Sequence, residues 1–552
     1  MRLSHVLVLI VCVFMSCKNR SPSKENTIQS NDFGQIFFSK VDLLKTKIPE
    51  VNYVNTFHLH KDEFLSIHFT LERPLIQSLK ELAPTLSEDE LLNKGNFHFS
   101  FLVDGEMMYE ENLNTGAGTK LLKTEELNQV VRLITPAQIG FWGWFMWQRF
   151  MRLHDGQEAF TVGKHTLSIE IKSYLKDDRV KVGALLAKGD ITVEVPKVTI
   201  DESLVAVQKI QANSGWEISK DSFDRKKIEA LNRKIAESRF EGININGIVV
   251  IKNNQLLIEE YFNGEKRNSL HDVRSVGKSF ASSIMGIAIA DGYIKSEDLL
   301  LKDFYHLKSF KNYSPKKDSV SLKSLLTMSS GFIGDDWDSS NPGNEENMYP
   351  TDDWVKFGLD LPMQKDKKMG EDYTYFTAGA VILGDIIHQS VPDGLVSYAD
   401  EKLFAPLNIT NYQWKYTPQD VGSTAGGIQL RAIDFAKYGQ LYKNNGKWKD
   451  QQIIDEDWVE KSLAKQVSQS YAGIADGYYG YLFWNKVYTV NGKDYEVSFC
   501  TGNGGNKIFI FKDIPFVIVV TASAYGMPNA HRTVDEMMVD YILPAILDKA
   551  NR

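Results

Sequence analysis

A serine and a lysine three positions apart form the first candidate catalytic pair in the sequence. Ser275 and Lys278 lie at the start of an apolar stretch with helical periodicity, which ends near a C-cap signal at Gly292. At a helix start this spacing brings the amine beside the hydroxyl, and the helix end offers backbone N–H groups to a developing oxyanion. A lysine can deprotonate a serine when burial or neighbouring cations lower its pKa. The pair therefore indicates an activated serine.

The same segment contains part of a phosphate-binding pattern. Gly277-Lys278-Ser279 would end a P-loop, but the first glycine of that loop would fall at Asp272, so a P-loop is excluded. A chance Ser-x-x-Lys pair on a helix is the other alternative, because two residues alone make a weak motif. The rest of the chain must decide between a chance pair and a nucleophile.

Three further segments follow the pair in order. They are Leu322–Phe332, Tyr373–Gly384 and Thr501–Ile508. Together with Arg274–Ser279 they resemble the motifs of the serine β-lactamase and penicillin-binding-protein superfamily. The resemblance is strongest to the branch of class C β-lactamases, D-aminopeptidases and DD-peptidases, β-lactamase-fold esterases and 6-aminohexanoate-dimer hydrolases. It covers roughly residues 242–547.

The resemblance implies a role for each catalytic residue. Ser275 would be the nucleophile, Lys278 its partner and Tyr375 the second member of the base pair. Because the two basic groups would titrate together, the sequence does not decide whether Lys278 or Tyr375 removes the serine proton. The implied mechanism passes through an acyl-enzyme that water releases, and no metal or organic cofactor is expected.

The last motif would complete the oxyanion hole and part of the substrate site. The resemblance assigns the oxyanion to the backbone N–H groups of Ser275 and Asn506. Gly504 and Gly505 would let the substrate approach the strand closely, because neither has a Cβ atom.

The sequence departs from the family pattern at several positions. Thr377 replaces an Asn or Ser that can contact substrate amides, and Asn503 replaces a Lys or His that often binds a substrate carboxylate. Met328 stands where the family has His. The neutral Asn503 favours an ester or amide without a free carboxylate beside the scissile bond. Cys500 is expected to be a small buried residue rather than an alternative nucleophile.

These residues predict a serine hydrolase that cleaves a carboxylic ester or amide through an acyl-enzyme on Ser275. One alternative is a β-lactamase or DD-peptidase acting on β-lactams or peptidoglycan peptides. The other is a non-catalytic protein of the cell envelope that binds ligands on the same fold. The expected partner is a small ester or amide, or an envelope peptide, as substrate.

The elements that must position the catalytic residues follow from hydrophobic periodicity. Residues 225–239 predict a helix, residues 247–261 predict a hairpin that turns at Asn253-Asn254, and residues 507–511 and 516–521 predict a pair of strands. This mixture indicates an α+β domain, which we place at residues 242–552 after a connector and first helix at 201–241.

The preceding part of the chain has a different pattern. Residues 96–103 and 164–171 alternate polar and apolar side chains, as half-buried strands do, so residues 33–200 predict a β-sandwich-like domain. This domain would space the catalytic domain from the membrane or help to wall the cleft. Its aromatic cluster Phe141–Met151 is expected to pack the sandwich or its contact with the second domain, rather than to form a ligand platform or a membrane contact.

The first 32 residues indicate export. A positively charged start, an apolar run over residues 6–15 and Ser16-Cys17 resemble a bacterial lipoprotein signal that ends at a lipidated Cys17, with a plain secretory signal or a short membrane anchor as alternatives. The run is too short to span a bilayer as a helix. Residues 18–32 are polar and predict a flexible tether. We therefore expect a membrane-anchored lipoprotein of the bacterial envelope, facing the periplasm or the cell surface.

Composition excludes several other classes. The chain has 552 residues, of which 43% are hydrophobic and 24% are charged, so it is long enough for several globular domains. A net charge of −8 has the wrong sign for a nucleic-acid-binding protein. The three cysteines are too few for a disulfide scaffold or a cysteine-built zinc site. His58 and His60 lie on one face of a predicted strand without a further metal ligand nearby in sequence.

Overall fold

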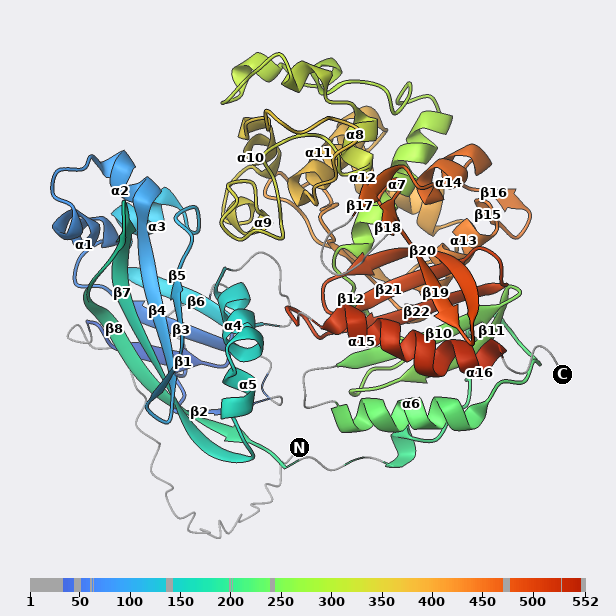
Figure 1. Cartoon of the computed structure of the whole chain (residues 1–552), viewed down its shortest axis with the longest axis horizontal. Coiled ribbons are helices and arrows are strands. Elements are labelled where there is room, and N and C mark those ends of the chain that lie inside the picture. The colour runs from blue at the N-terminus through green and yellow to red at the C-terminus, as the bar shows by residue number, and fades with distance from the viewer. Residues whose placement is uncertain are drawn as a thin grey trace, which may run out of the picture.

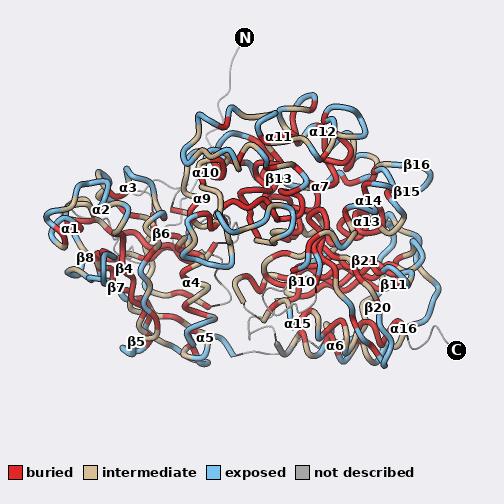
Figure 2. The backbone as a smooth tube through the Cα atoms, turned by 45° about the horizontal axis from the view of Figure 1, so that its top comes forward, coloured by how far each residue is buried: buried red, intermediate tan, exposed pale blue. Residues whose placement is uncertain are grey.

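The chain folds around two separate hydrophobic cores. The computed structural model describes residues 33–43, 51–59, 62, 64–135, 142–197, 200, 202–238, 244–469, 477–527 and 529–547. One core is built from residues between Ile36 and Val193, and the other from residues between Ile228 and Ile546. Figure 2 shows the buried backbone of each core. The predicted signal peptide, Cys17 and the tether lie outside the described residues, as does His60.

The first core lies in a β-rich part of the chain, which we call the N-terminal unit (residues 33–197). Its sheets have the strand orders β1-β3-β6 and β2-β8-β7-β4-β5. The strands are β1 (Ile36–Ser39), β2 (Thr56–His58), β3 (Leu65–Thr70), β4 (Gly95–Val103), β5 (Glu106–Asn112), β6 (Asn128–Ile134), β7 (Gly163–Lys176) and β8 (Val180–Val195). The β-rich character predicted for this region is confirmed.

The two strands predicted from alternation are neighbours in the larger sheet. β4 pairs antiparallel with β7, with Phe99 opposite Ile171. Both side chains are fully buried in the core between the sheets. The turn after β4 is Asp104-Gly105, with φ values of 52° and 86°, a conformation typical of a tight hairpin.

Within the described residues, five helices accompany these sheets. They are α1 (Leu75–Leu82), α2 (Glu88–Lys94), α3 (Lys120–Thr124), α4 (Trp142–Leu153) and α5 (Gly156–Ala159). Helix α4 holds most of the aromatic cluster, and its Met146, Trp147, Phe150 and Met151 belong to the first core. The packing role predicted for the cluster is confirmed for these residues, while Phe141 lies outside the described residues.

The second core is organised by a nine-stranded sheet in the order β17-β18-β19-β20-β21-β22-β10-β11-β9. We call this part the C-terminal unit. Its strands are β9 (Glu217–Ile218), β10 (Ile245–Lys252), β11 (Gln255–Tyr261), β17 (Val467–Gln469), β18 (Gly477–Tyr479), β19 (Trp484–Val490), β20 (Lys493–Gly502), β21 (Asn506–Phe511) and β22 (Phe516–Ala522). The predicted β10–β11 hairpin and the predicted β21–β22 pair are present.

Helices cover both faces of this sheet (Figure 1). Helices α7 (Val276–Ala290) and α13 (Ala432–Lys443) contact its central strands on one face. On the other face lie α6 (Arg225–Ser238), α15 (Ala530–Met537) and α16 (Leu543–Leu547). This arrangement confirms the predicted α+β fold and places the start of α7 against the end of β20.

A helical layer lies on the far side of α7. It contains α8 (Leu322–Leu326), α9 (Glu345–Met348), α10 (Trp354–Asp360), α11 (Thr377–Ser390) and α12 (Gly394–Ala399), with α14 (Glu456–Leu463) beside the sheet. Short strands β12 (His271–Asp272), β13 (Tyr412–Trp414), β14 (Ile428–Leu430), β15 (Lys447–Trp448) and β16 (Gln451–Gln452) complete the unit. No helix within the described part of the chain has both the length and the apolar character needed to span a membrane.

Candidate active site

Ser275 occupies the N-cap position of α7, at the end of a tight turn. Arg274 before it has a φ of 54°, and the N–H of Gly277 bonds to the carbonyl of Arg274. The turn lies directly against a neighbouring loop, because a Cβ atom on Gly277 would be 3.0 Å from the Cα of Gly426. This close approach explains why glycine stands at 277.

Lys278 lies beneath Ser275 in the protein interior and is 1% exposed. Its Nζ is 2.8 Å from Ser275 Oγ and donates to the carbonyl of Ala425 at 2.6 Å. Burial lowers the pKa of Lys278, although the nearby charges of Glu345 and Asp336 oppose this change. The lowered pKa favours the neutral amine, which is the form that can accept a proton.

Tyr375 contacts the same two residues. Its ring centroid lies 5.3 Å from Lys278 Nζ. Burial raises the pKa of its phenol well above the ordinary value, and this effect outweighs a side-chain hydrogen bond with Ser275 that lowers the pKa. The phenol therefore stays protonated near neutral pH. Ser275, Lys278 and Tyr375, which the sequence separates by up to a hundred positions, are brought together in one cluster.

Asp336 is hydrogen-bonded to the chain on either side of this cluster. Its carboxylate accepts the N–H of Thr377 at 2.7 Å and the N–H of Glu345 at 2.9 Å, so it caps the first turns of both α11 and α9. Its own N–H donates to the carbonyl of Tyr375 at 3.1 Å. Three hydrogen bonds thus tie Asp336 to the segments that carry Tyr375 and Glu345.

The site also holds an unusual pair of acidic groups. Burial raises the pKa of Asp336 to about 8, and the charge of Glu345 acts in the same direction. The hydrogen bond with Thr377 and the charge of Lys278 oppose this rise. Tyr349 donates to Glu345 Oε2 at 2.8 Å. The protonation of Lys278 is therefore linked to that of Asp336, and the charge of Glu345 acts to raise the pKa of both groups.

Thr377 is the first residue of α11 and is fully buried. Its backbone N–H donates to the carboxylate of Asp336, and Thr377 is not among the residues that line the pocket described below. The sequence motif thus leads to the start of a helix, and the threonine itself lies in the interior.

The turn between β20 and β21 lies beside Ser275. A Cβ atom on Gly502 would be 2.0 Å from the carbonyl oxygen of Val273 and 2.9 Å from the N of Ser275, so the strand end touches the nucleophile's turn. Asn503 follows it and lines the pocket, with its Oδ1 accepting the N–H of Gly526 at 2.8 Å.

The remaining residues of this turn are placed differently. Gly504 and Gly505 have φ values of 89° and 91°, which favour glycine, and Tyr525 and Val534 occupy the space beside them. Asn506 is fully buried, donates to the carbonyl of Asn503 and accepts the N–H of Ala522. Its side chain therefore braces the turn from inside.

A narrow pocket opens beside Ser275. Its volume is about 40 Å³, and it is lined by Trp144, Phe145, Arg274, Ser275, Glu345, Tyr349, Ser423, Ala425, Gly426, Gly427 and Asn503. Arg274 is the only cation among these lining residues, and its Nε lies 3.7 Å from Asp272. Two of the lining residues, Trp144 and Phe145, come from the N-terminal unit.

Sequence reasoning missed the acidic pair and these two aromatic residues. Asp336 and Glu345 lie in a loop rich in Asp and Asn, and no spacing marks them as partners of Lys278. Cys500 is buried, and burial raises the pKa of its thiol to about 12, which is consistent with the inert role predicted for it. Within the described residues, no group of three or more His, Cys, Asp or Glu side chains is arranged to hold a metal ion.

A comparison with protein families agrees with this geometry. Residues 231–537 match the family model described as Beta-lactamase, and the match covers more than half of the chain. The chain belongs to the β-lactamase family. Members of this family are serine hydrolases, and the matched residues include Ser275, Lys278 and Tyr375 while the N-terminal unit lies outside the match.

Three proteins to which the chain is similar share less than a quarter of their residues with it over the matched regions. Protein flp of Staphylococcus aureus strain N315 is 23% identical over 208 residues, which cover 36% of this chain and 41% of that protein. The chain thus spans about two fifths of the length of this relative. A penicillin-binding protein homologue from Pyrococcus abyssi is 18% identical, covering 56% of this chain and 79% of the other, with a TM-score of 0.44. D-amino acid amidase from Ochrobactrum anthropi SV3 is 13% identical, with coverages of 57% and 98% and a TM-score of 0.43.

Proposed function

We propose that this protein is a serine hydrolase that cleaves a carboxylic ester or amide through an acyl-enzyme on Ser275. The observation that carries the proposal is the contact between Lys278 Nζ and Ser275 Oγ, which are 2.8 Å apart. The side chain of Tyr375 forms a hydrogen bond with the same serine. A serine with a desolvated amine within hydrogen-bond reach has the geometry of an activated nucleophile.

The directions of the pKa shifts favour Lys278 as the base. A neutral Lys278 takes the proton of Ser275 Oγ as the oxygen forms a bond to the substrate carbonyl carbon. The tetrahedral intermediate then collapses, the bond to the leaving alcohol or amine breaks, and the leaving group takes a proton from Tyr375 or from the lysine ammonium. Water attacks the resulting serine ester in the same way and releases the carboxylic acid, which restores Ser275.

The oxyanion requires two N–H donors beside Ser275. The N–H of Ser275 at the start of α7 is one donor, and the β20–β21 turn supplies the second. We assign the second donor to the backbone of this turn, because Gly502 lies against Ser275 while Asn503 lines the pocket. The sequence assigned this role to Asn506, which stands directly opposite Gly502 in the strand pairing.

The charges around the pocket favour a substrate without a free carboxylate beside the scissile bond. Asn503 is neutral, and the carboxylate of Glu345 would repel a second carboxylate. The one cation on the lining, Arg274, already lies next to Asp272 and stacks on the ring of Tyr525 at 4.6 Å. These features support simple esters and amides over β-lactams and D-Ala-D-Ala peptides.

The decisive experiment measures the intact mass of the purified full-length protein after treatment with a fluorophosphonate. One adduct in the wild-type protein that is absent from Ser275→Ala, with both proteins folded by circular dichroism, would support the proposal. No adduct on the folded wild-type protein would contradict it and would favour a ligand-binding role for the fold. Turnover of nitrocefin or of a D-Ala-D-Ala peptide at rates above those for p-nitrophenyl acetate would replace the proposed substrate class.

A further inference from the structure

Helix α4 of the N-terminal unit reaches the catalytic pocket. Trp144 and Phe145 line the pocket together with Ser275. Trp144 is 2% exposed, yet it belongs to neither hydrophobic core. Its ring lies 5.1 Å from the guanidinium of Arg274 and 6.1 Å from the ring of Tyr525. Trp144 thus packs directly on the residue that precedes the nucleophile.

The following residues of α4 are fixed in the N-terminal unit. Trp147 and Phe150 lie in the first core, and a Cβ atom on Gly143 would be 2.4 Å from a methyl carbon of Val131 in β6. The helix therefore lies close against its own sheet. Close packing of this kind restricts the movement of the helix, so Trp144 and Phe145 keep fixed positions at the pocket.

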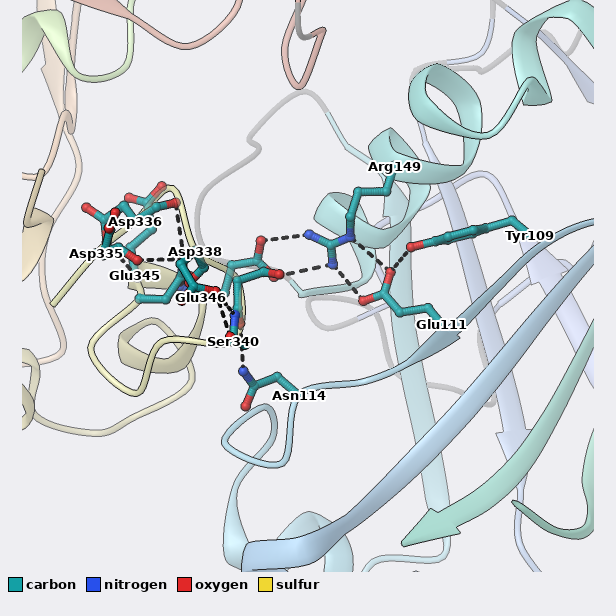
Figure 3. Close-up of polar contacts among 12 residues, drawn as sticks. Tyr109, Glu111, Asn114, Arg149, Asp335, Asp336, Asp338, Ser340, Glu345 and Glu346 are labelled. Carbon is teal, nitrogen blue, oxygen red and sulfur yellow. Dashed lines mark hydrogen bonds and ion pairs between the residues drawn. The ribbon is translucent and has the colours of Figure 1, made fainter. Parts of the chain in front are cut away.

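A partly buried ion-pair network joins α4 to the loop beside the catalytic residues (Figure 3). Arg149 donates to Glu111 of β5 at 2.7 Å and to Glu346 of α9 at 2.8 Å. Burial raises the pKa of Glu346, while the charge of Arg149 opposes the rise. The guanidinium of Arg149 therefore stabilises the ionised form of Glu346. Tyr109 donates to Glu111 from the side of the N-terminal unit.

The loop on the other side of this network carries the acidic pair of the site. Glu346 directly follows Glu345, and Asp336 lies ten positions earlier in the same loop. A second contact joins the loop to the N-terminal unit, since Asn114 donates to the carbonyl of Ser339 at 2.9 Å. One segment, residues 335–349, therefore contacts Tyr375 at one end and the N-terminal unit at the other.

We propose that helix α4 is a wall of the substrate pocket, and that Trp144 and Phe145 limit the size of the group that fits beside Ser275. The Arg149–Glu346 pair is the positioning contact that holds this wall against the loop of Asp336 and Glu345. The inference rests on the proposed function and extends it, because it makes the N-terminal unit a determinant of substrate size. With this wall in place the volume beside Ser275 is about 40 Å³, so we expect a short acyl group to be accommodated better than a long one.

The first test compares Phe145→Ala with Phe37→Ala. Phe145 is partly exposed on the pocket, whereas Phe37 lies in β1 and packs on Tyr53, so the control removes the same ring from the same unit. Acylation rates are measured with p-nitrophenyl acetate and p-nitrophenyl octanoate on the full-length protein. The acetate should be preferred about tenfold or more in wild type and Phe37→Ala, and Phe145→Ala should reduce this preference at least about fivefold by gaining rate on octanoate. An unchanged preference, with acetate still hydrolysed, overturns the inference and leaves the proposed function standing.

The second test does not need activity. Hydrogen exchange is compared between Arg149→Met and Arg73→Met, because Arg73 pairs with Glu81 on the exposed surface of the same unit. Arg149→Met should speed exchange at least about tenfold in both α4 and residues 335–349, and Arg73→Met should change neither. If no ester acylates any variant, the proposed function fails. The hydrogen-exchange comparison then still decides whether α4 is held against residues 335–349. Equal exchange in Arg149→Met and wild type overturns the inference.

Discussion

At the scale of single residues, a substitution at Tyr375 can separate the contribution of its hydroxyl to proton transfer from the contribution of its ring to packing. Tyr375→Phe keeps the ring that packs on Trp337 and Trp484 but removes the hydroxyl that bonds to Ser275. We expect kcat for p-nitrophenyl acetate to fall by about 10²- to 10³-fold, because a positioned proton donor is lost. The free energy of unfolding in urea should change by no more than about 1 kcal/mol.

Tyr416→Phe is the matched control, since this tyrosine is 53% exposed and lies outside the pocket lining. Its kcat should equal the wild-type value. A kcat of Tyr375→Phe within about threefold of the control would show that the phenol takes no part in proton transfer.

Glu345 offers a test of the charge balance around Lys278. The carboxylate of Glu345 raises the pKa of Lys278, so Glu345→Gln should lower that pKa, while the amide oxygen can still accept from Tyr349. If the neutral lysine is the base, activity appears as pH rises through this pKa. The acidic limb of the kcat/KM profile should therefore move to lower pH.

The control for this profile is Glu371→Gln. Glu371 is a surface carboxylate paired with Lys368. Its replacement should leave the pH of the acidic limb of the kcat/KM profile unchanged. A limb that moves to higher pH, or stays in place, in Glu345→Gln would contradict neutral Lys278 as the base.

The catalytic residues differ in how far the sequence predicts them. Ser275 and Lys278 are predictable because their contact is set by one turn of helix. Asp336 and Glu345 are not, because they reach Lys278 through the fold of an irregular loop that Asp336 fixes against Thr377. Contacts of this kind depend on hydrogen bonds between segments that are distant in sequence, and hydrophobic periodicity carries no signal for them.

At the scale of secondary-structure elements, the contact between β20 and the start of α7 determines whether the site forms. Gly502→Ala would place a Cβ atom 2.0 Å from the carbonyl oxygen of Val273, so strand and turn must separate. We expect a loss of about 2 kcal/mol in the free energy of unfolding. We also expect a fall of at least about tenfold in kcat, because the donors around the oxyanion are displaced.

Gly492→Ala is the comparison for this change. Gly492 lies in the turn after β19 with a φ of 73° and open space around its Cα, so alanine there adds strain but no clash. It should cost about 1 kcal/mol of stability and leave kcat unchanged. If Gly502→Ala retained full activity, the strand end would not be part of the catalytic arrangement.

The elements themselves could be predicted where their patterns are strong. The β10–β11 hairpin follows from two apolar runs joined by Asn253-Asn254, and both asparagines adopt the left-handed conformation, with φ values of 50° and 63°. The cluster in α4 was predicted to pack, and most of it does. Its contact with the pocket could not be predicted, because which face of a helix meets another unit depends on how the two units dock.

At the scale of the whole molecule, we considered the N-terminal unit as a spacer from the membrane or as a wall of the cleft, and the structure bears on the second role. The unit contributes Trp144 and Phe145 to the pocket beside Ser275. The two units are also joined by an ion pair, because Arg149 contacts Glu346. This contact ties the N-terminal unit to the segment that carries Glu345.

The membrane anchor is the remaining prediction at this scale, and it rests on the sequence alone. If Cys17 is lipidated, the wild-type protein should sediment with bacterial membranes, and its mature N-terminal peptide should begin at a Cys17 that carries the lipid mass. Cys17→Ala should move the protein out of the membrane fraction without altering its rate on p-nitrophenyl acetate, because the pocket residues lie in other parts of the chain. Ser16→Thr is a milder change beside the same position and should retain some lipidated protein. Membrane association that survives in Cys17→Ala would point instead to an uncleaved apolar segment at residues 6–15 as the anchor.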